Sequence, residues 1–136
     1  MRFESMDWPM GAHISEGRSL TMTQCTSTGD MIYVAPGASL VMQDSRVFSG
    51  GDDGVQCYGN VKATRCTIEE NIYDGVYVTG QDSSVELVDC VIRKNGDDGV
   101  FVTEGKAILR GGTISTAAAN ASLQLGAAGF FAAGAT

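Results

Sequence analysis

An aspartate recurs along the chain at positions 30, 53, 74 and 98, with spacings of 23, 21 and 24 residues. The unit is clearest from Asp74 to Ile92, where an Asp-Gly turn precedes the alternating stretch 76–78 and a second turn leads to the alternating stretch 85–88. Strand-like alternation inside a repeat of this length is typical of a β-solenoid, in which each repeat forms one coil. The sequence therefore predicts a single all-β domain of about five coils.

Aligning the copies predicts the interior of this solenoid. Like side chains should stack from coil to coil at the inter-strand spacing of about 4.8 Å. The first column is Ala12, Ile32, Val55, Val76, Val100 and Leu123, and the second is Ile14, Val34, Cys57, Val78, Val102 and Leu125. The third is Leu20, Leu40, Val61, Val85 and Ala107, with a shift of one residue pair left open for its first two members. The fourth is Ser27, Val47, Ile68, Ile92 and Ile114.

The two ends of the chain depart from the repeat. Residues 1–10 are expected to form an N-terminal cap, in which Phe3, Met6 and Trp8 close the apolar end of coils 11–116. Residues 117–136 are expected to form an incomplete coil and a Gly/Ala-rich C-terminal cap or docking tail, which is the candidate for an oligomer contact. The only helix expected is a short one near residues 116–119.

Charge and cysteine content narrow the classes of function. The net charge of −7 argues against nucleic acid and anionic membranes, and no stretch approaches the roughly 20 apolar residues of a membrane span. The first ten residues lack the apolar core of a secretory signal. The four cysteines form no C-x-x-C pair, which argues against a zinc site. Cys25, Cys66 and Cys90 share a column and Cys57 lies in an interior one, so we expect buried free thiols, which favour a reducing compartment while leaving localisation open.

Asn71 and Asn95 each open the phrase N-x-x-D-G-V-x-V and should stack as an asparagine ladder. This ladder and phrase resemble those of right-handed parallel β-helix proteins of the pectate-lyase-like superfamily, and the resemblance covers about residues 11–116. It implies a short right-handed parallel β-helix. That fold carries lyases, hydrolases, epimerases and non-catalytic scaffolds, so it implies no single function.

Aromatic side chains recur at the outward-facing positions of the short strand that follows each recurring aspartate. One outward column is His13, Tyr33, Gln56, Tyr77 and Phe101, and its neighbour is Ser15, Ala35, Tyr58, Thr79 and Thr103. Aromatic platforms beside carboxylates suit a glycan or a protein partner, which predicts a ligand or partner strip formed by Tyr33, Tyr58, Tyr77, Phe101, Asp53, Asp74 and Asp98.

The resemblance implies that a substrate groove follows a comparable face and that paired acids there bind calcium or do acid–base work. The candidates for calcium are Asp52, Asp53, Asp97 and Asp98. Two alternatives remain open. Aspartate before glycine is common turn chemistry, and stacked aromatics are common ladder packing. His13, the only histidine, lies at the end of the strip and is a further candidate, but no residue is assigned as catalytic.

Charged side chains also align between coils. Asp44, Arg65 and Asp89 share a column, Glu69 faces Arg93, and Glu70 faces Lys94. We interpret these residues as a solvated charge ladder, with a lyase-like base as the alternative.

The leading hypothesis is a non-catalytic scaffold or interaction module that binds a protein or an acidic glycan through the strip or through a solenoid end. The alternative is a carbohydrate-binding or carbohydrate-modifying unit of the lyase, epimerase or hydrolase type, or a fragment of one. An ice-binding solenoid ranks below both, because Arg46 and Val91 interrupt the column of Thr26, Thr67 and Thr113.

Overall fold

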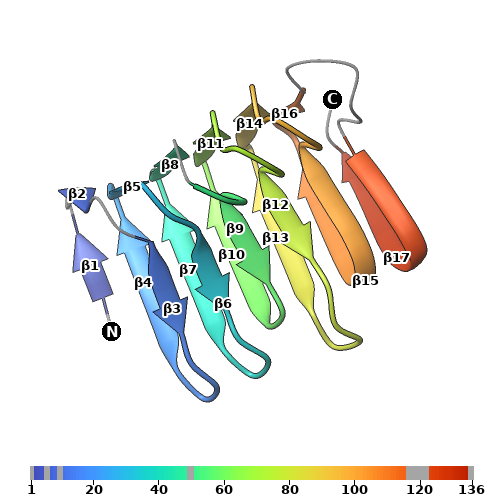
Figure 1. Ribbon diagram of the computed structural model, residues 1–136, viewed down its shortest axis with the longest axis horizontal. Helices are drawn as coiled ribbons and strands as arrows, with labels where there is room; N and C mark the ends of the chain where they lie inside the picture. The colour runs from blue at the N-terminus through green and yellow to red at the C-terminus, as the bar shows by residue number, and fades with distance from the viewer. Residues whose placement is uncertain (1, 5–6, 9–10, 49–50, 116–122, 135–136) are drawn as a thin grey trace.

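Each sequence repeat forms one coil of three short strands, and successive coils stack into a parallel solenoid (Figure 1). The structure is a computed structural model that describes residues 2–4, 7–8, 11–48, 51–115 and 123–134. Residues 3, 7–8 and 123–134 are described by their backbone alone. The coils follow one another from β1 at one end to β17 at the other, with all neighbouring strands parallel.

The strands line up in three rows. The first row contains β3 (Ala12–Ile14), β6 (Ile32–Val34), β9 (Val55–Cys57), β12 (Val76–Val78) and the start of β15 (Val100–Arg110). The second row contains β1 (Arg2–Glu4), β4 (Ser19–Thr23), β7 (Ser39–Gln43), β10 (Asn60–Thr64), β13 (Ser84–Val88) and the end of β15. The third row contains β2 (Asp7–Trp8), β5 (Thr26–Thr28), β8 (Arg46–Phe48), β11 (Thr67–Glu69), β14 (Val91–Arg93) and β16 (Thr113–Ile114).

The strand register confirms the four predicted columns. Val78 pairs with Cys57 in one direction and with Val102 in the other, as the second column requires. Leu20 pairs with Leu40, and Leu40 with Val61, so the third column has no shift. In β6, β7, β9, β10 and β13 buried side chains alternate with more exposed ones, because alternate residues of a strand point to opposite faces of the sheet. In β11 Glu69 is buried beside Ile68 and breaks the alternation.

The corner between the second and third rows depends on a left-handed backbone conformation. The residue after each of β4, β7, β10, β13 and β15 has a positive φ of 51 to 66°, and these residues form a column of Gln24, Asp44, Arg65, Asp89 and Gly111. Residues that carry a Cβ rarely adopt this backbone conformation. The coil-to-coil hydrogen bonds of the strands on both sides hold the column in it.

The four cysteines are buried free thiols, as predicted. Burial raises the pKa of the Cys57 thiol to about 12. A hydrogen bond with Cys90, together with burial, raises the pKa of the Cys66 thiol. Both thiols therefore stay protonated near neutral pH, which makes them poor nucleophiles.

The two ends of the solenoid are also strands. β1 and β2 extend the second and third rows beyond β4 and β5. β17 (Leu123–Gly134) pairs with β15, placing Leu123 on Val100 and Leu125 on Val102 as expected, and its pairing continues to Gly134. Met6 and residues 116–119 lie outside the described residues, as do the side chains of Phe3 and Trp8. The capping and docking roles expected for the two ends stay predictions.

The part of the chain that the structure describes contains no helix, and so none that could cross a membrane.

Candidate functional site

The aromatic members of the predicted strip, here called the aromatic strip, lie on the outer face of the first row. They are Tyr33, Tyr58, Tyr77 and Phe101, and their rings contact one another or His13 in two groups. In the first group the ring centroids of His13 and Tyr33 are 4.7 Å apart, and those of Tyr33 and Tyr58 are 5.2 Å apart. In the second, Tyr77 and Phe101 stack with centroids 5.5 Å apart and an interplanar angle of 20°. Tyr33, Tyr58, Tyr77 and Phe101 point outward, as strand alternation predicts. They are half-buried rather than fully exposed, because neighbouring rings cover part of each ring.

Three of the predicted strip residues, Asp53, Asp74 and Asp98, form a buried ladder. The backbone N–H of Asp74 donates to Asp53 Oδ1 (2.8 Å), and that of Asp98 donates to Asp74 Oδ1 (2.9 Å). The side-chain amide of Gln56 donates to Asp53 Oδ2 (2.9 Å). The turn-chemistry alternative matches this geometry, although the N–H donors belong to neighbouring coils rather than to the same turn.

Stacking carboxylates in this way changes their protonation. Burial raises the pKa of Asp53. Burial, followed by the neighbouring carboxylates of Asp53, Asp98 and Asp97, raises the pKa of Asp74 to about 7. The backbone N–H of Asp98 opposes the shift by stabilising the carboxylate, but it does not outweigh burial. Asp74 therefore exchanges its proton near neutral pH.

One group of carboxylates could hold a cation. Asp74, Asp97 and Asp98 each bring one oxygen within 4.8 Å of the others, and Asp97 is the exposed member. Two of the four calcium candidates thus come together with Asp74, which was not among the four. Asp52 and Asp53 are not in this group, and Asp52 Oδ1 accepts the backbone N–H of Asp53. Carboxylate oxygens suit a hard cation, but calcium takes about 6–8 ligands and this group supplies three, so calcium stays a prediction.

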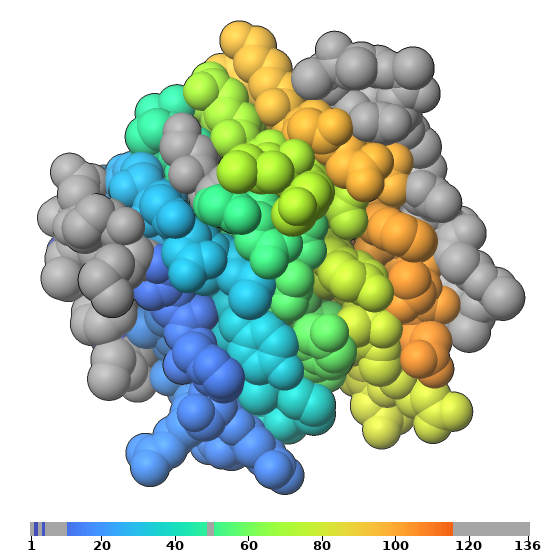
Figure 2. All heavy atoms as spheres, in the orientation of Figure 1, coloured from blue at the N-terminus to red at the C-terminus, as the bar shows by residue number. Residues whose placement is uncertain are grey.

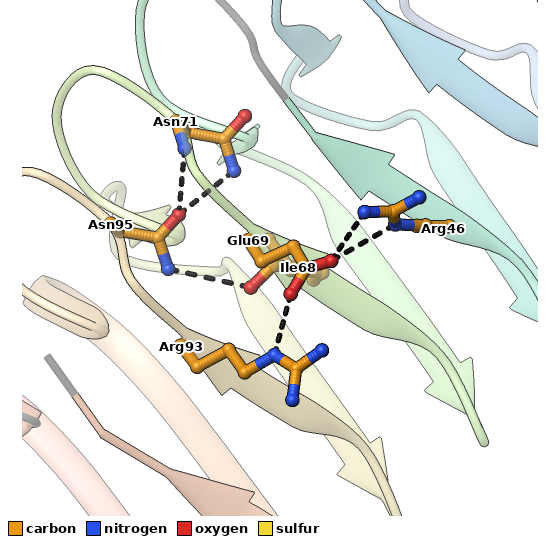
Figure 3. A network of polar contacts seen from close by, with 6 residues as sticks. All are labelled: Arg46, Ile68, Glu69, Asn71, Arg93 and Asn95. Carbon is orange, nitrogen blue, oxygen red and sulfur yellow. Dashed lines mark hydrogen bonds and ion pairs between the residues drawn. The ribbon is translucent and has the colours of Figure 1, made fainter. Parts of the chain in front are cut away.

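The asparagine ladder is confirmed and explains the repeated phrase (Figure 3). Asn95 Oδ1 accepts the backbone N–H of Asn71 (3.1 Å) and its side-chain amide (2.9 Å). A Cβ at Gly54 would lie 2.7 Å from the amide nitrogen of Asn71, and one at Gly75 would lie 2.7 Å from that of Asn95. Each asparagine therefore requires the glycine at the start of its own coil, so this part of the motif serves the fold.

A second polar network crosses the third row and centres on Glu69 (Figure 3). Nε and Nη2 of Arg46 donate to Glu69 Oε1, and Nε of Arg93 donates to Oε2. Glu69 is only 3% exposed, so the expectation of a solvated ladder is wrong at this position, where two arginine side chains cover the carboxylate. Hydrogen bonds from Arg93 and Arg46 lower the pKa of Glu69 despite its burial. The expected pair Glu69–Arg93 is confirmed.

Arg46 was missed as a third member of this network. Its strand-register partner is Thr67, and it reaches Glu69 diagonally while its guanidinium lies over the ring of Phe48, 3.8 Å from the centroid. Simple column alignment does not reveal such diagonal contacts. Farther from the network, Arg65 pairs with Asp44 in solvent, as expected of a charge ladder.

Two exposed apolar residues had no counterpart among the predicted site residues. Ile72 and Tyr73, in the loop between β11 and β12, are 56% and 52% exposed. Ile72 and Tyr73 occupy the two x positions of the phrase N-x-x-D-G-V-x-V, which Gly96 and Asp97 occupy in the next copy. The repeat therefore did not indicate an exposed apolar pair there. His13 lies on the edge strand β3, beside a pocket of about 490 Å³ formed by residues of the first coil.

Comparison with known proteins agrees with the fold. The profile described as "Right handed beta helix region" matches residues 9–116. The chain therefore belongs to this family of right-handed β-helix proteins, and the coils described above are those of a right-handed parallel β-helix. None of the curated proteins or solved structures compared with the chain matches it.

Proposed function

We propose that the protein is a non-catalytic recognition module that contacts its partner through the aromatic strip. The observation that carries this proposal is the contact between neighbouring rings on one outward face, Tyr33 with Tyr58 and Tyr77 with Phe101. These rings are held by a rigid sheet and are already partly ordered by their own contacts. A partner would therefore gain apolar burial at a small cost in side-chain ordering.

The aspartates beside the strip support a structural more than a catalytic role. Oδ1 of Asp53 and Oδ1 of Asp74 each accept a backbone N–H from the next coil, and both residues are buried. A carboxylate used in this way orients the Asp-Gly turn and fixes the start of the aromatic strand. Of the acidic group, Asp97 is the member exposed to solvent and so the one that can meet a ligand directly.

The test compares two double variants of similar character. Tyr77→Ser with Phe101→Ser removes the stacked pair, and Val41→Ser with Ile108→Ser removes half-buried apolar side chains from the outer face of the second row. Binding is measured against proteins of the native extract and against uronate oligomers with and without calcium. We expect the strip variant to weaken binding by about tenfold or more, as loss of aromatic contacts does, and the control to bind as the unaltered protein does. If the strip variant changes no interaction while its melting temperature falls, the strip is only a packing ladder.

The second candidate is a carbohydrate-binding or carbohydrate-modifying unit. Asp74 favours it, because a carboxyl with a pKa of about 7 beside Asp97 and Asp98 can exchange a proton at neutral pH. Asp97→Asn separates the candidates. It should weaken binding of a uronate bridged by calcium and leave a mainly apolar protein interface unaffected. Turnover of uronate oligomers that Asp97→Asn abolishes would replace the non-catalytic proposal with the enzymatic one.

A further inference from the structure

The turns between the first and second rows have unequal lengths, which leaves a notch at this corner of the solenoid. Two residues, Tyr58 and Gly59, connect β9 to β10. Four residues make the same connection in the preceding coil, and five make it in the following one. The green turn accordingly stands back between its cyan and yellow-green neighbours (Figures 1 and 2).

This notch is a pocket of about 320 Å³. Pro36 and Gly37 form one wall, Gln81 and Asp82 form the other, and Tyr58 and Asn60 lie between them. Its volume is near the lower end of the range of about 300–1,000 Å³ that is typical of ligand pockets. The notch therefore suits one ring-sized unit rather than a peptide segment or a helix.

Backbone hydrogen bonds shape both walls of the notch before any ligand arrives. The N–H of Ala38 donates to the carbonyl of Ala35 (2.9 Å), and the N–H and Oγ of Ser83 donate to the carbonyl of Gly80 (3.1 and 2.7 Å). A Cβ at Gly59 would lie 2.4 Å from the carbonyl oxygen of Ala38, so the short turn packs against its neighbour without space for a side chain. A preformed pocket of this kind loses little conformational entropy when it binds a ligand.

The side chains that line the notch are suited to bind a hydroxyl-rich ligand. Tyr58 offers an aromatic surface, and its contact with Tyr33 connects the notch to the aromatic strip. Asn60 Oδ1 accepts a hydrogen bond from Ser84 Oγ (2.6 Å), which directs the amide N–H groups of Asn60 elsewhere. Gln81 and Asp82 are exposed, and within the described part of the chain no other residue engages either side chain. The notch thus combines one apolar surface with amide donors and a carboxylate acceptor.

Charge decides between the hydroxyl-rich ligands. The described lining residues include Asp82 and no lysine or arginine, and the whole chain carries a net charge of −7. A uronate or a phosphate would meet an unbalanced negative field here, whereas a neutral sugar ring would not. We propose that the notch is a binding subsite for one neutral hexopyranose unit of an oligosaccharide, with neighbouring units lying along the aromatic strip. The inference rests on the proposed recognition function for those neighbouring units.

The test measures binding of cellohexaose, mannohexaose and hexagalacturonate by calorimetry, together with amide chemical shifts of the full chain. The variant Gln81→Ala with Asp82→Asn removes polar groups of the notch and leaves the strip intact. Glu16→Gln is the matched control, because Glu16 is an exposed acid in the corner turn of the first coil and does not line the notch. We expect one of the two neutral hexaoses to shift the amides of residues 58–60 and 80–82. We also expect the notch variant to weaken its binding by about tenfold, as loss of two hydrogen bonds does, and Glu16→Gln to leave it unchanged.

Two results would overturn the inference. One is that neither neutral hexaose binds, or that hexagalacturonate binds more tightly than both. The other is that the notch variant binds like the unaltered protein while Tyr77→Ser with Phe101→Ser does not, which would leave the strip as the recognition surface and remove the notch from it. If the notch variant weakens binding of a neutral hexaose while Tyr77→Ser with Phe101→Ser leaves every interaction unchanged, the proposed function of the strip alone is contradicted.

Discussion

Asp74 occupies a position in which hydrogen bonding and charge act in opposite directions. Its Oδ1 accepts the backbone N–H of Asp98, which favours the carboxylate. Its burial and the carboxylates of Asp53, Asp98 and Asp97 favour the neutral acid, and they raise its pKa to about 7. The folded state therefore binds a proton at Asp74 more tightly than the unfolded chain, whose aspartates have a pKa of about 3.9. The stabilisation that this proton gives is complete below about pH 3.9 and is lost as the pH rises through 7.

We therefore predict that Asp74→Asn stabilises the protein at pH 8 and has little effect at pH 4. Asparagine keeps the acceptor oxygen but carries no charge, so it imitates the protonated acid at every pH. The expected rise in melting temperature at pH 8 is roughly 2–8 °C, because about 1 kcal/mol shifts the melting temperature by about 4–8 °C in domains of 60–100 residues and by about 2–4 °C in domains of 150–250 residues. Asp30→Asn is the control, because Asp30 is the exposed member of the same aspartate column. An equal change for Asp74→Asn at both pH values would show that its charge does not matter.

Among the elements, the third row depends on one buried carboxylate. Glu69 on β11 holds Arg46 of β8 and Arg93 of β14, so its side chain connects three successive coils (Figure 3). Both arginines are about half exposed and keep part of their hydration. The network therefore stabilises less than a fully buried ion pair with the same contacts would.

We predict that Glu69→Gln lowers the free energy of unfolding at pH 7 by about 1–3 kcal/mol. The three hydrogen bonds from Arg46 and Arg93 lose the negative charge of their acceptor, and the amide nitrogen of glutamine cannot accept a hydrogen bond from either arginine. Because the pKa of Glu69 is lowered in the folded state, its contribution is fully present above the unfolded pKa of about 4.3 and is lost as the pH falls from there through the lowered folded pKa. The cost of Glu69→Gln should therefore shrink in acid. Urea unfolding at pH 7 and pH 3.5 measures both effects, with the exposed Glu70→Gln as control. A cost that is the same at both pH values would contradict the role given to the carboxylate.

The difference between Glu69 and the interior columns shows which features can be read from the repeat. Val55, Val76 and Val100 were aligned correctly because strand alternation and coil length specify a column directly. The diagonal contact from Arg46 to Glu69 depends on side-chain reach, which alignment does not encode. The aromatic residues Tyr33 and Tyr77 were placed on the correct face of the sheet. The burial of the three aspartates and their bonds from coil to coil follow from turn geometry, which alignment does not encode. The notch did have a sequence signal, since two residues separate Cys57 from Asn60 where neighbouring coils have four and five.

In the molecule as a whole, each coil contacts mainly the coils before and after it. In such a stack the stability is roughly a sum of coil terms and of terms between neighbouring coils. A destabilising substitution in a terminal coil can therefore unfold that coil alone, because the loss of one terminal coil exposes little of the apolar interior of the other coils. Damage in the middle removes the contacts on both sides, and the remaining pieces are too short to bury a sufficient core.

We predict that Val78→Asp prevents folding and that Ala12→Asp does not. Val78 is fully buried between Cys57 and Val102, and an unpaired charge there costs several kcal/mol, a large part of a total stability of about 5–15 kcal/mol. Ala12 belongs to a neighbouring interior column but lies on the edge strand β3, where a carboxylate reaches water at a cost of about 1 kcal/mol or less. Circular dichroism and thermal melting of both variants make the comparison. A soluble Val78→Asp variant that melts like the unaltered protein would contradict the column assignment, because the side chain at position 78 would then have to face solvent.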